Sequence, residues 1–184
     1  MTRGAQNASS AKLDLKLAAD QLQQLEDALD SESIGDVVSS AKTNLLSMLS
    51  LNKLSKATDR SVAEIAARCD AIMSSDPGIT LDDGSDAQEI KAHALYAKAR
   101  LLISIIPALN LFKRKRSYRD AIDILHQSTN SSPNQATYLA IGFCLRQLKD
   151  QEGEATAYQA CIALDAESEY ALEAARNQRD LGLR

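Results

Sequence analysis

Few residues in this 184-residue chain have the types and spacing that catalysis requires. The two histidines, His93 and His126, are isolated and belong to no HExxH pattern, and the chain has no nucleophile-elbow motif and no glycine-rich phosphate loop. A lone histidine in a helix is far more often structural or solvated than catalytic. The sequence therefore predicts a protein that is not an enzyme.

The three cysteines, Cys69, Cys144 and Cys161, are the next candidates for chemistry. They are widely spaced in apolar patterns, without the CxxC or CxH spacing of zinc ligands, and their odd number argues against a disulfide framework. We interpret them as small core residues of a protein in a reducing compartment and predict a cytoplasmic location.

The segment of residues 74–86, SSDPGITLDDGSD, breaks the helical pattern on both sides of it. Its carboxylates Asp82, Asp83 and Asp86 suggest calcium, but the segment lacks the ligand order of an EF-hand loop. We expect Asp86 instead to cap the next helix, with Glu89 completing a capping box. The sequence therefore predicts no metal and no cofactor.

Residues 101–116, LLISIIPALNLFKRKR, join the most apolar run of the chain to its densest block of positive charge. A membrane anchor, a nucleic-acid or nuclear-targeting patch, and a buried helix end followed by a solvated turn are the alternatives. Pro107 interrupts the apolar run, which is shorter than the about 20 residues that span a bilayer, so we predict no transmembrane segment and a buried apolar half. The basic half is expected in a turn before Ser117, the predicted N-cap of the next helix. It forms a candidate site for an acidic partner surface or anionic lipid, made of Lys113, Arg114, Lys115, Arg116 and Arg119.

The composition favours an all-α fold, since the chain is rich in Ala and Leu and contains only seven Gly and three Pro. Apolar spacing predicts about eight helices, arranged as a bundle or as a solenoid of helical hairpins. We expect a disordered tail over residues 1–9, a three-helix segment over 10–75 with helices at 10–32, 33–56 and 59–75, and a second helical domain over 86–184. The N-terminus lacks an uninterrupted apolar stretch, so no secretory signal is predicted.

The first predicted helix carries a stripe of apolar residues spaced by three and four: Leu15, Ala18, Leu22, Leu25 and Leu29. The stripe resembles a coiled-coil seam of about two heptads. It is expected either to pack on the chain's own helices, which we favour, or to pair between subunits in a homo-oligomer.

Residues Gln135–Ser168 form a unit of 34 residues with a helix, a short turn and a second helix. The unit resembles one tetratricopeptide repeat, and residues 117–134 resemble the second helix of a weaker copy, which gives about two recognisable repeats. In this resemblance Gly142 allows the two helices to approach closely, while Tyr138 and Tyr158 fill the space around it. Glu154 departs from the family's Ala at the tightest crossing, and a one-residue shift that places Ala155 there is our interpretation. The positions that match the repeat are Tyr138, Ile141, Gly142, Leu145, Tyr158, Cys161, Ile162, Leu164 and Asp165.

The resemblance implies a concave groove lined by the first helix of each repeat. In this chain the groove positions are Ala136, Leu139, Phe143, Arg146, Tyr170, Glu173 and Asn177. Because Phe143 stands where some members have a carboxylate-binding Asn, an apolar-anchored helix or extended segment is the expected ligand. Coverage of Leu139 and Phe143 by the N-terminal helices is the alternative.

The sequence thus predicts a non-catalytic protein–protein interaction module, such as an adaptor or scaffold. One alternative is a protein that binds an anionic membrane surface or nucleic acid through residues 113–116. Another is a purely structural oligomerisation protein.

Overall fold

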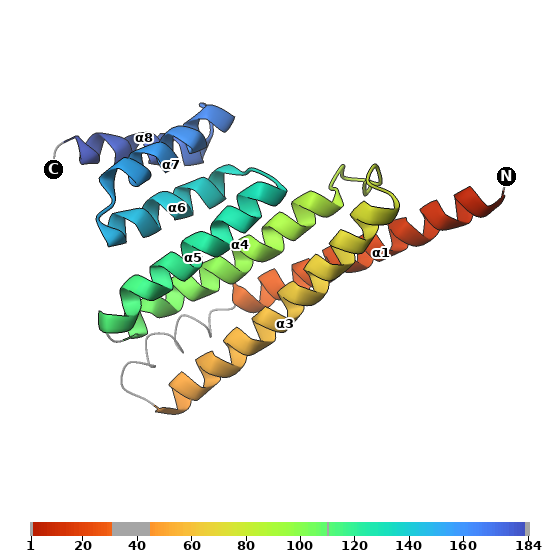
Figure 1. Ribbon diagram of the computed structural model, residues 1–184, viewed down its shortest axis with the longest axis horizontal. Helices are drawn as coiled ribbons and strands as arrows, with labels where there is room; N and C mark the ends of the chain where they lie inside the picture. The colour runs from red at the N-terminus through yellow and green to blue at the C-terminus, as the bar shows by residue number, and fades with distance from the viewer. Residues whose placement is uncertain (1, 31–44, 110, 183–184) are drawn as a thin grey trace.

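The apolar spacing of the sequence is realised as helices along the described chain. The computed structural model describes residues 2–30, 45–109 and 111–182, and within them seven α-helices and one short 3-10 helix (Figure 1). The all-α prediction is confirmed for these residues. The helices are α1 (Thr2–Leu29), α3 (Leu45–Ser75), α4 (Ala87–Ile105), η1 (Ile106–Ala108), α5 (Leu111–Ser131), α6 (Gln135–Leu148), α7 (Gln151–Leu164) and α8 (Glu169–Leu181).

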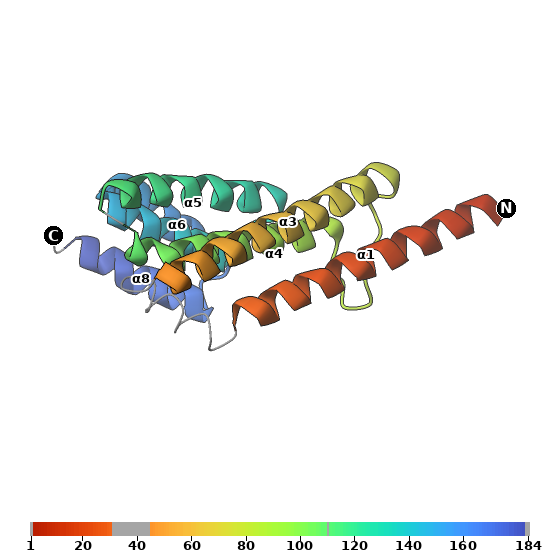
Figure 2. The ribbon, with the colours of Figure 1, turned by 90° about the horizontal axis from the view of Figure 1, so that it is seen from below.

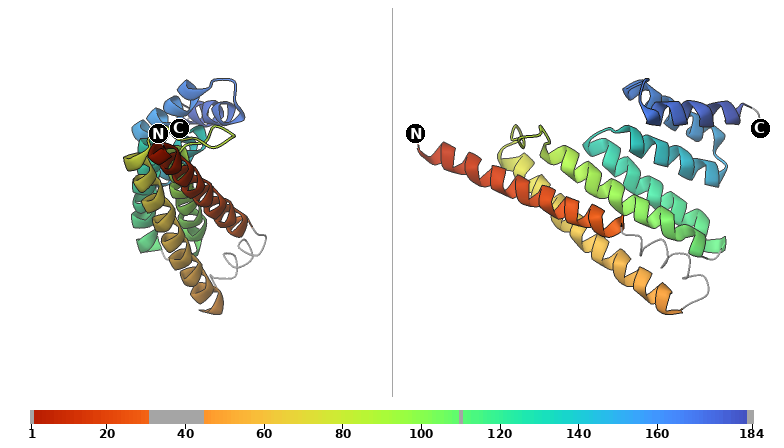
Figure 3. Two further views of the ribbon diagram at one scale, coloured as in Figure 1. Left: turned by 90° about the vertical axis from the view of Figure 1, so that its right-hand side faces the viewer. Right: turned by 180° about the vertical axis from the view of Figure 1, so that it is seen from behind.

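Successive helices pack against one another along the whole described chain, and a second set of contacts joins alternate helices: α1 with α4, α4 with α6, and α6 with α8. Figure 2 shows α5 toward one side of the molecule and α1 and α8 toward the other, while α3 runs obliquely between the two sides. The end-on view of Figure 3 shows the same oblique course of α3. The helices therefore form one continuous stack in chain order.

Three clusters of buried side chains hold this arrangement together. The first joins α1, α3 and the N-terminal part of α4. It therefore connects the two predicted domains, which residues 76–86 separate in the sequence. The second joins α4, α5, α6 and Ala157 of α7, and the third joins α6, α7 and α8. The α1 stripe lies in the first cluster, so it packs within the chain as favoured. It is not exposed for pairing between subunits.

The helix α3 differs from the sequence prediction of two helices at 33–56 and 59–75. It continues through Thr58 and Asp59, and residues 31–44 lie outside the described residues. Thr58 is 2% exposed, and Asp59 pairs with Lys98 of α4 at 2.9 Å instead of capping a helix. No Gly or Pro lies between Leu45 and Ser75, so nothing in the sequence ends the helix there.

Two helix starts also differ from the prediction. The first helix extends back to Thr2, so residues 2–9 are helical where a disordered tail is predicted, in keeping with a stretch that contains no Pro. The fifth helix begins at Leu111, not near Ser117, so the basic block lies on its first turns instead of in a turn.

Other local predictions are confirmed. The helix α4 ends at Ile105, and Pro107 lies at the start of η1. Leu101 and Ile106 are buried, so part of the apolar run is in the core. The carboxylate of Asp86 caps α4 by accepting from the amide of Glu89 at 2.8 Å, and Ser168 caps α8 through the amide of Ala171.

The three cysteines are free and buried, as predicted. Burial raises the pKa of Cys69 to about 11 and that of Cys144 to about 12, and burial also raises the pKa of Cys161. Since the thiolate is the nucleophile, these thiols are protected while the chain is folded.

We expect the thiols of the native protein to react with a disulfide reagent at pH 8 on the order of a hundredfold slower than in denaturant. The unfolded thiols, with an ordinary pKa of 9.0, also ionise before the folded ones as the pH rises. The contribution of the thiols to the free energy of unfolding should therefore be constant below about pH 9 and decrease above it, up to about pH 11 for Cys69 and about pH 12 for Cys144. Fast native labelling would contradict the burial.

Candidate functional site

The close crossing of α6 and α7 sets the position of the predicted groove residues. A Cβ on Gly142 would lie 2.7 Å from Cδ1 and 2.8 Å from Cζ of Tyr158, so only glycine fits without movement of that ring. Tyr158 is 1% exposed and packs in the third cluster. The predicted role of Gly142 in helix approach is confirmed.

A buried ion pair lies at the same crossing. Nε of Arg146 donates to Oε1 of Glu154 at 2.6 Å, and Glu154 is 1% exposed. The Arg146 guanidinium also lies 5.8 Å from the centre of the Tyr158 ring. The interpretation that places Ala155 at the crossing is therefore wrong, because Glu154 is buried there while Ala155 is half-buried.

The ionic state of this pair follows from its surroundings. Burial lowers the pKa of Arg146, but the hydrogen bond to Glu154 and the neighbouring Tyr158 outweigh it, so the pKa lies above its usual value. The Nη2 atom of Arg146 is buried and has no hydrogen-bond partner among the described atoms. Arg146 therefore holds α6 to α7, and the structure does not present its charge as an open contact for a partner.

The remaining predicted groove residues lie on α6 and α8. Leu139 packs against the third cluster, which leaves it half-buried. Phe143 is 41% exposed, and its ring edge contacts Tyr118 of α5 with 6.4 Å between centroids. On α8, Tyr170 is 48% exposed, Glu173 is exposed and Asn177 is half-buried.

The helix α4 adds residues that the sequence reasoning missed. Burial raises the pKa of Tyr96, Arg100 lowers it, and Tyr170 of α8 raises it. Tyr170 therefore influences Tyr96 electrostatically, although α6 separates their helices in the packing order. Arg100 lies 6.0 Å from the centre of the Tyr96 ring and donates to Asp30 at 2.8 Å. We call the surface formed by Tyr96, Arg100, Leu139, Phe143, Tyr170, Glu173 and Asn177 the α4–α6–α8 face.

The basic block is divided by its position on α5. Arg114 folds back and donates to the carbonyl oxygens of Leu109 and Pro107 at 3.0 and 2.9 Å, so it satisfies the end of the preceding helical segment. Lys113, Lys115, Arg116 and Arg119 are exposed. Four of the five predicted basic residues therefore face solvent, and Arg114 is structural.

The candidate metal ligands have other partners. Asp82 pairs with Lys12 at 2.6 Å, Asp83 accepts from the amide of Ser85 at 2.9 Å, and Asp86 caps α4. No group of three or more His, Cys, Asp or Glu that could hold a metal occurs in the described part of the chain.

Comparison with known proteins adds no relative: no family model, no curated protein and no solved structure matches this chain. Among residues 2–30, 45–109 and 111–182, no helix combines the length and apolar character of a membrane crossing.

We expect Gly142→Leu to lower the free energy of unfolding by about 1–3 kcal/mol, because the new side chain overlaps the buried Tyr158 ring. Gly78→Leu is the matched control, since no atom lies within 4 Å of a Cβ there. Equal denaturation midpoints for the two variants would contradict the close crossing.

Glu154→Ala should lower the free energy of unfolding by about 2 kcal/mol, because it leaves the Arg146 charge without its partner. Adding Arg146→Met should restore most of the loss. Asp30→Ala, which breaks an exposed pair with Arg100, should have a smaller effect than Glu154→Ala. A double-mutant cycle by urea denaturation that gives no coupling between Arg146 and Glu154 would argue against the pair.

Proposed function

We propose that this protein is a non-catalytic interaction module built from stacked helical hairpins of the tetratricopeptide type. In this proposal α1 and α3, α4 and α5, and α6 and α7 are successive hairpins, and α8 packs on the last of them. The α4–α6–α8 face binds a helical or extended segment of another protein.

The order of helix contacts supports the stacking. In stacked hairpins each first helix contacts its own second helix, the preceding second helix and the neighbouring first helices. The pairs α1–α4, α4–α6 and α6–α8 are the contacts that such stacking requires. The Gly142–Tyr158 contact supports the assignment of α6 and α7 as one repeat.

The observation that carries the binding proposal is the exposure of Phe143 on α6 and of Tyr170 on α8, two helices that contact each other. Exposed aromatic side chains are frequent anchors of protein interfaces because they bury much area with little loss of side-chain entropy. Tyr96 of α4 is half-buried, and Tyr170 influences it electrostatically, so α4 is included in the proposed face. Arg100 and Glu173 would supply the polar contacts that orient a ligand.

The test compares two double variants that remove similar exposed apolar area. Phe143→Ser with Tyr170→Ser alters the α4–α6–α8 face. Leu164→Ser with Leu172→Ser alters side chains that are 46% and 53% exposed elsewhere on α7 and α8. Affinity purification from source cells, quantified by mass spectrometry, should show partners that the first variant loses and the second retains, with affinity reduced at least about thirtyfold.

Circular dichroism should show the same helicity for both variants. Partners retained by the first variant, or lost equally by both, would contradict the proposed binding face.

A further inference from the structure

A row of cations runs along α3. Lys53, Lys56 and Arg60 are exposed and spaced by three and four residues, which places them on one side of the helix. Leu49 continues the same spacing toward the start of α3 and is 50% exposed. One carboxylate in this stretch, Asp59, is paired with Lys98 of α4, so it does not offset the row.

A second group of cations lies on the first turns of α5. Lys113, Arg116 and Arg119 are exposed, whereas Arg114 is bonded to backbone carbonyls. The carboxylates of Asp120 and Asp123 follow on the same helix, so the excess of positive charge is concentrated at its N-terminal end.

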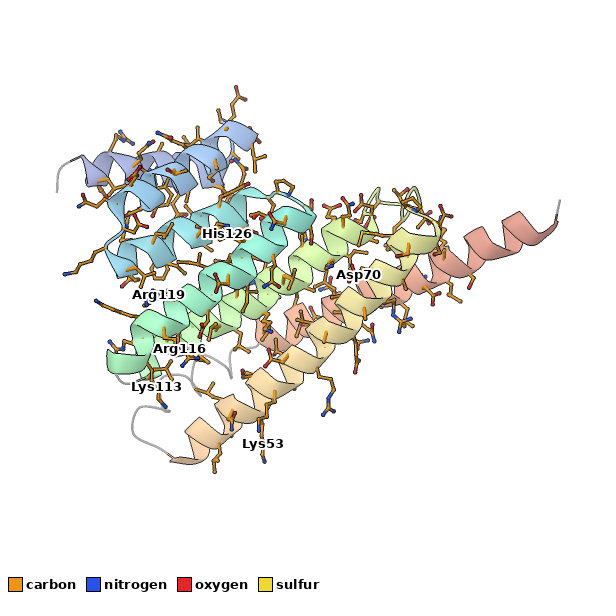
Figure 4. All side chains as sticks on the ribbon, viewed as in Figure 1. Lys53, Asp70, Lys113, Arg116, Arg119 and His126 are labelled. Atoms are coloured by element: carbon orange, nitrogen blue, oxygen red, sulfur yellow. The ribbon has the colours of Figure 1, made fainter. Side chains whose placement is uncertain are left out.

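The two groups lie toward the same end of the molecule. The helices α3 and α5 both begin at the lower left of Figure 1, and Figure 4 shows Lys53, Lys113, Arg116 and Arg119 toward that end. The positive ends of two helix dipoles are directed there as well. We call the six exposed cations of the two helices the basic face: Lys53, Lys56, Arg60, Lys113, Arg116 and Arg119.

This charge opposes that of the chain, which carries a formal net charge of −4. An anionic bilayer would repel most of such a protein and attract it through the basic face, so the charge distribution selects one orientation. The breadth of two helices suits a planar surface, and Leu49 provides an apolar side chain that can enter the headgroup region.

We propose that the basic face is a peripheral docking surface for bilayers that contain anionic lipids. Its cations contact headgroup phosphates and carboxylates, and Leu49 adds a shallow apolar contact. The basic face shares no residue with the α4–α6–α8 face, so the two surfaces can be altered separately. The proposal does not rest on the peptide-binding function.

The test measures co-flotation of the full chain with phosphatidylcholine vesicles, with and without phosphatidylserine, at low and at physiological ionic strength. We expect binding to the phosphatidylserine vesicles only, with a steep loss as salt increases. The α3 variant (Lys53→Ser, Lys56→Ser, Arg60→Ser) and the α5 variant (Lys113→Ser, Arg116→Ser, Arg119→Ser) should each reduce partitioning on the order of a hundredfold, at about fivefold per cation. Leu49→Ser should reduce it several-fold.

The matched control is Lys16→Ser with Arg176→Ser and Arg179→Ser, which removes three exposed cations from α1 and α8. It changes the net charge as much as the other triple variants and should keep most of the wild-type binding. Absence of wild-type binding to phosphatidylserine vesicles at low salt would overturn the proposal, as would an equal loss in the control. A loss confined to the α5 variant would overturn the two-helix surface. Binding to duplex DNA or polyglutamate without binding to vesicles would assign the face to another partner and overturn the proposal.

Discussion

The contact between Gly142 and the buried ring of Tyr158 determines how close α6 and α7 come, and the placement of α8 follows from it. Tyr158 forms the third cluster with Cys161 of α7 and Ala174 of α8. The ion pair of Arg146 and Glu154 fixes the register of the same crossing. A buried ion pair adds little to net stability, but any other arrangement of the helices that separates the two charges is strongly unfavourable. The crossing therefore selects one arrangement of α6, α7 and α8, and this arrangement fixes the positions of the exposed Phe143 and Tyr170.

The two proposed surfaces of the helix stack differ in chemistry. Phe143 and Tyr170 give the α4–α6–α8 face an aromatic character, whereas α3 and α5 present cations at their N-terminal ends. Together the two proposals describe an adaptor that holds a peptide segment on one surface while a second surface contacts an anionic membrane. Apolar anchoring and screened electrostatics respond differently to salt, so the two activities can be separated experimentally.

The sequence predicts those features that depend on neighbouring residues in the chain. Periodicity gives the helices, Asp86 and Ser168 mark helix starts, and Gly142 marks the close crossing. The errors arise where contacts distant in sequence decide the outcome. An Asp can cap the start of a helix, or it can lie within a helix and pair with a cation of a neighbouring helix. Asp59 does the latter, because it pairs with Lys98 of α4. The burial of Glu154 depends on Arg146 facing it across the hairpin, and an Arg eight residues before an unexpected Glu is the signal that could have predicted it. The sequence did not identify Tyr96 as a residue of the face, because Pro107 follows its helix and makes that helix a poor match to the first helix of a repeat.

Photo-cross-linking in the source cells tests the central claim most directly. Benzoylphenylalanine replaces Phe143 or Tyr170 with little change in shape, and Leu164 and Leu172 provide control positions of similar exposure. The account predicts covalent adducts to the same partner from positions 143 and 170 and none from 164 or 172. Adducts that form only at the control positions, or equally at all four, would contradict it.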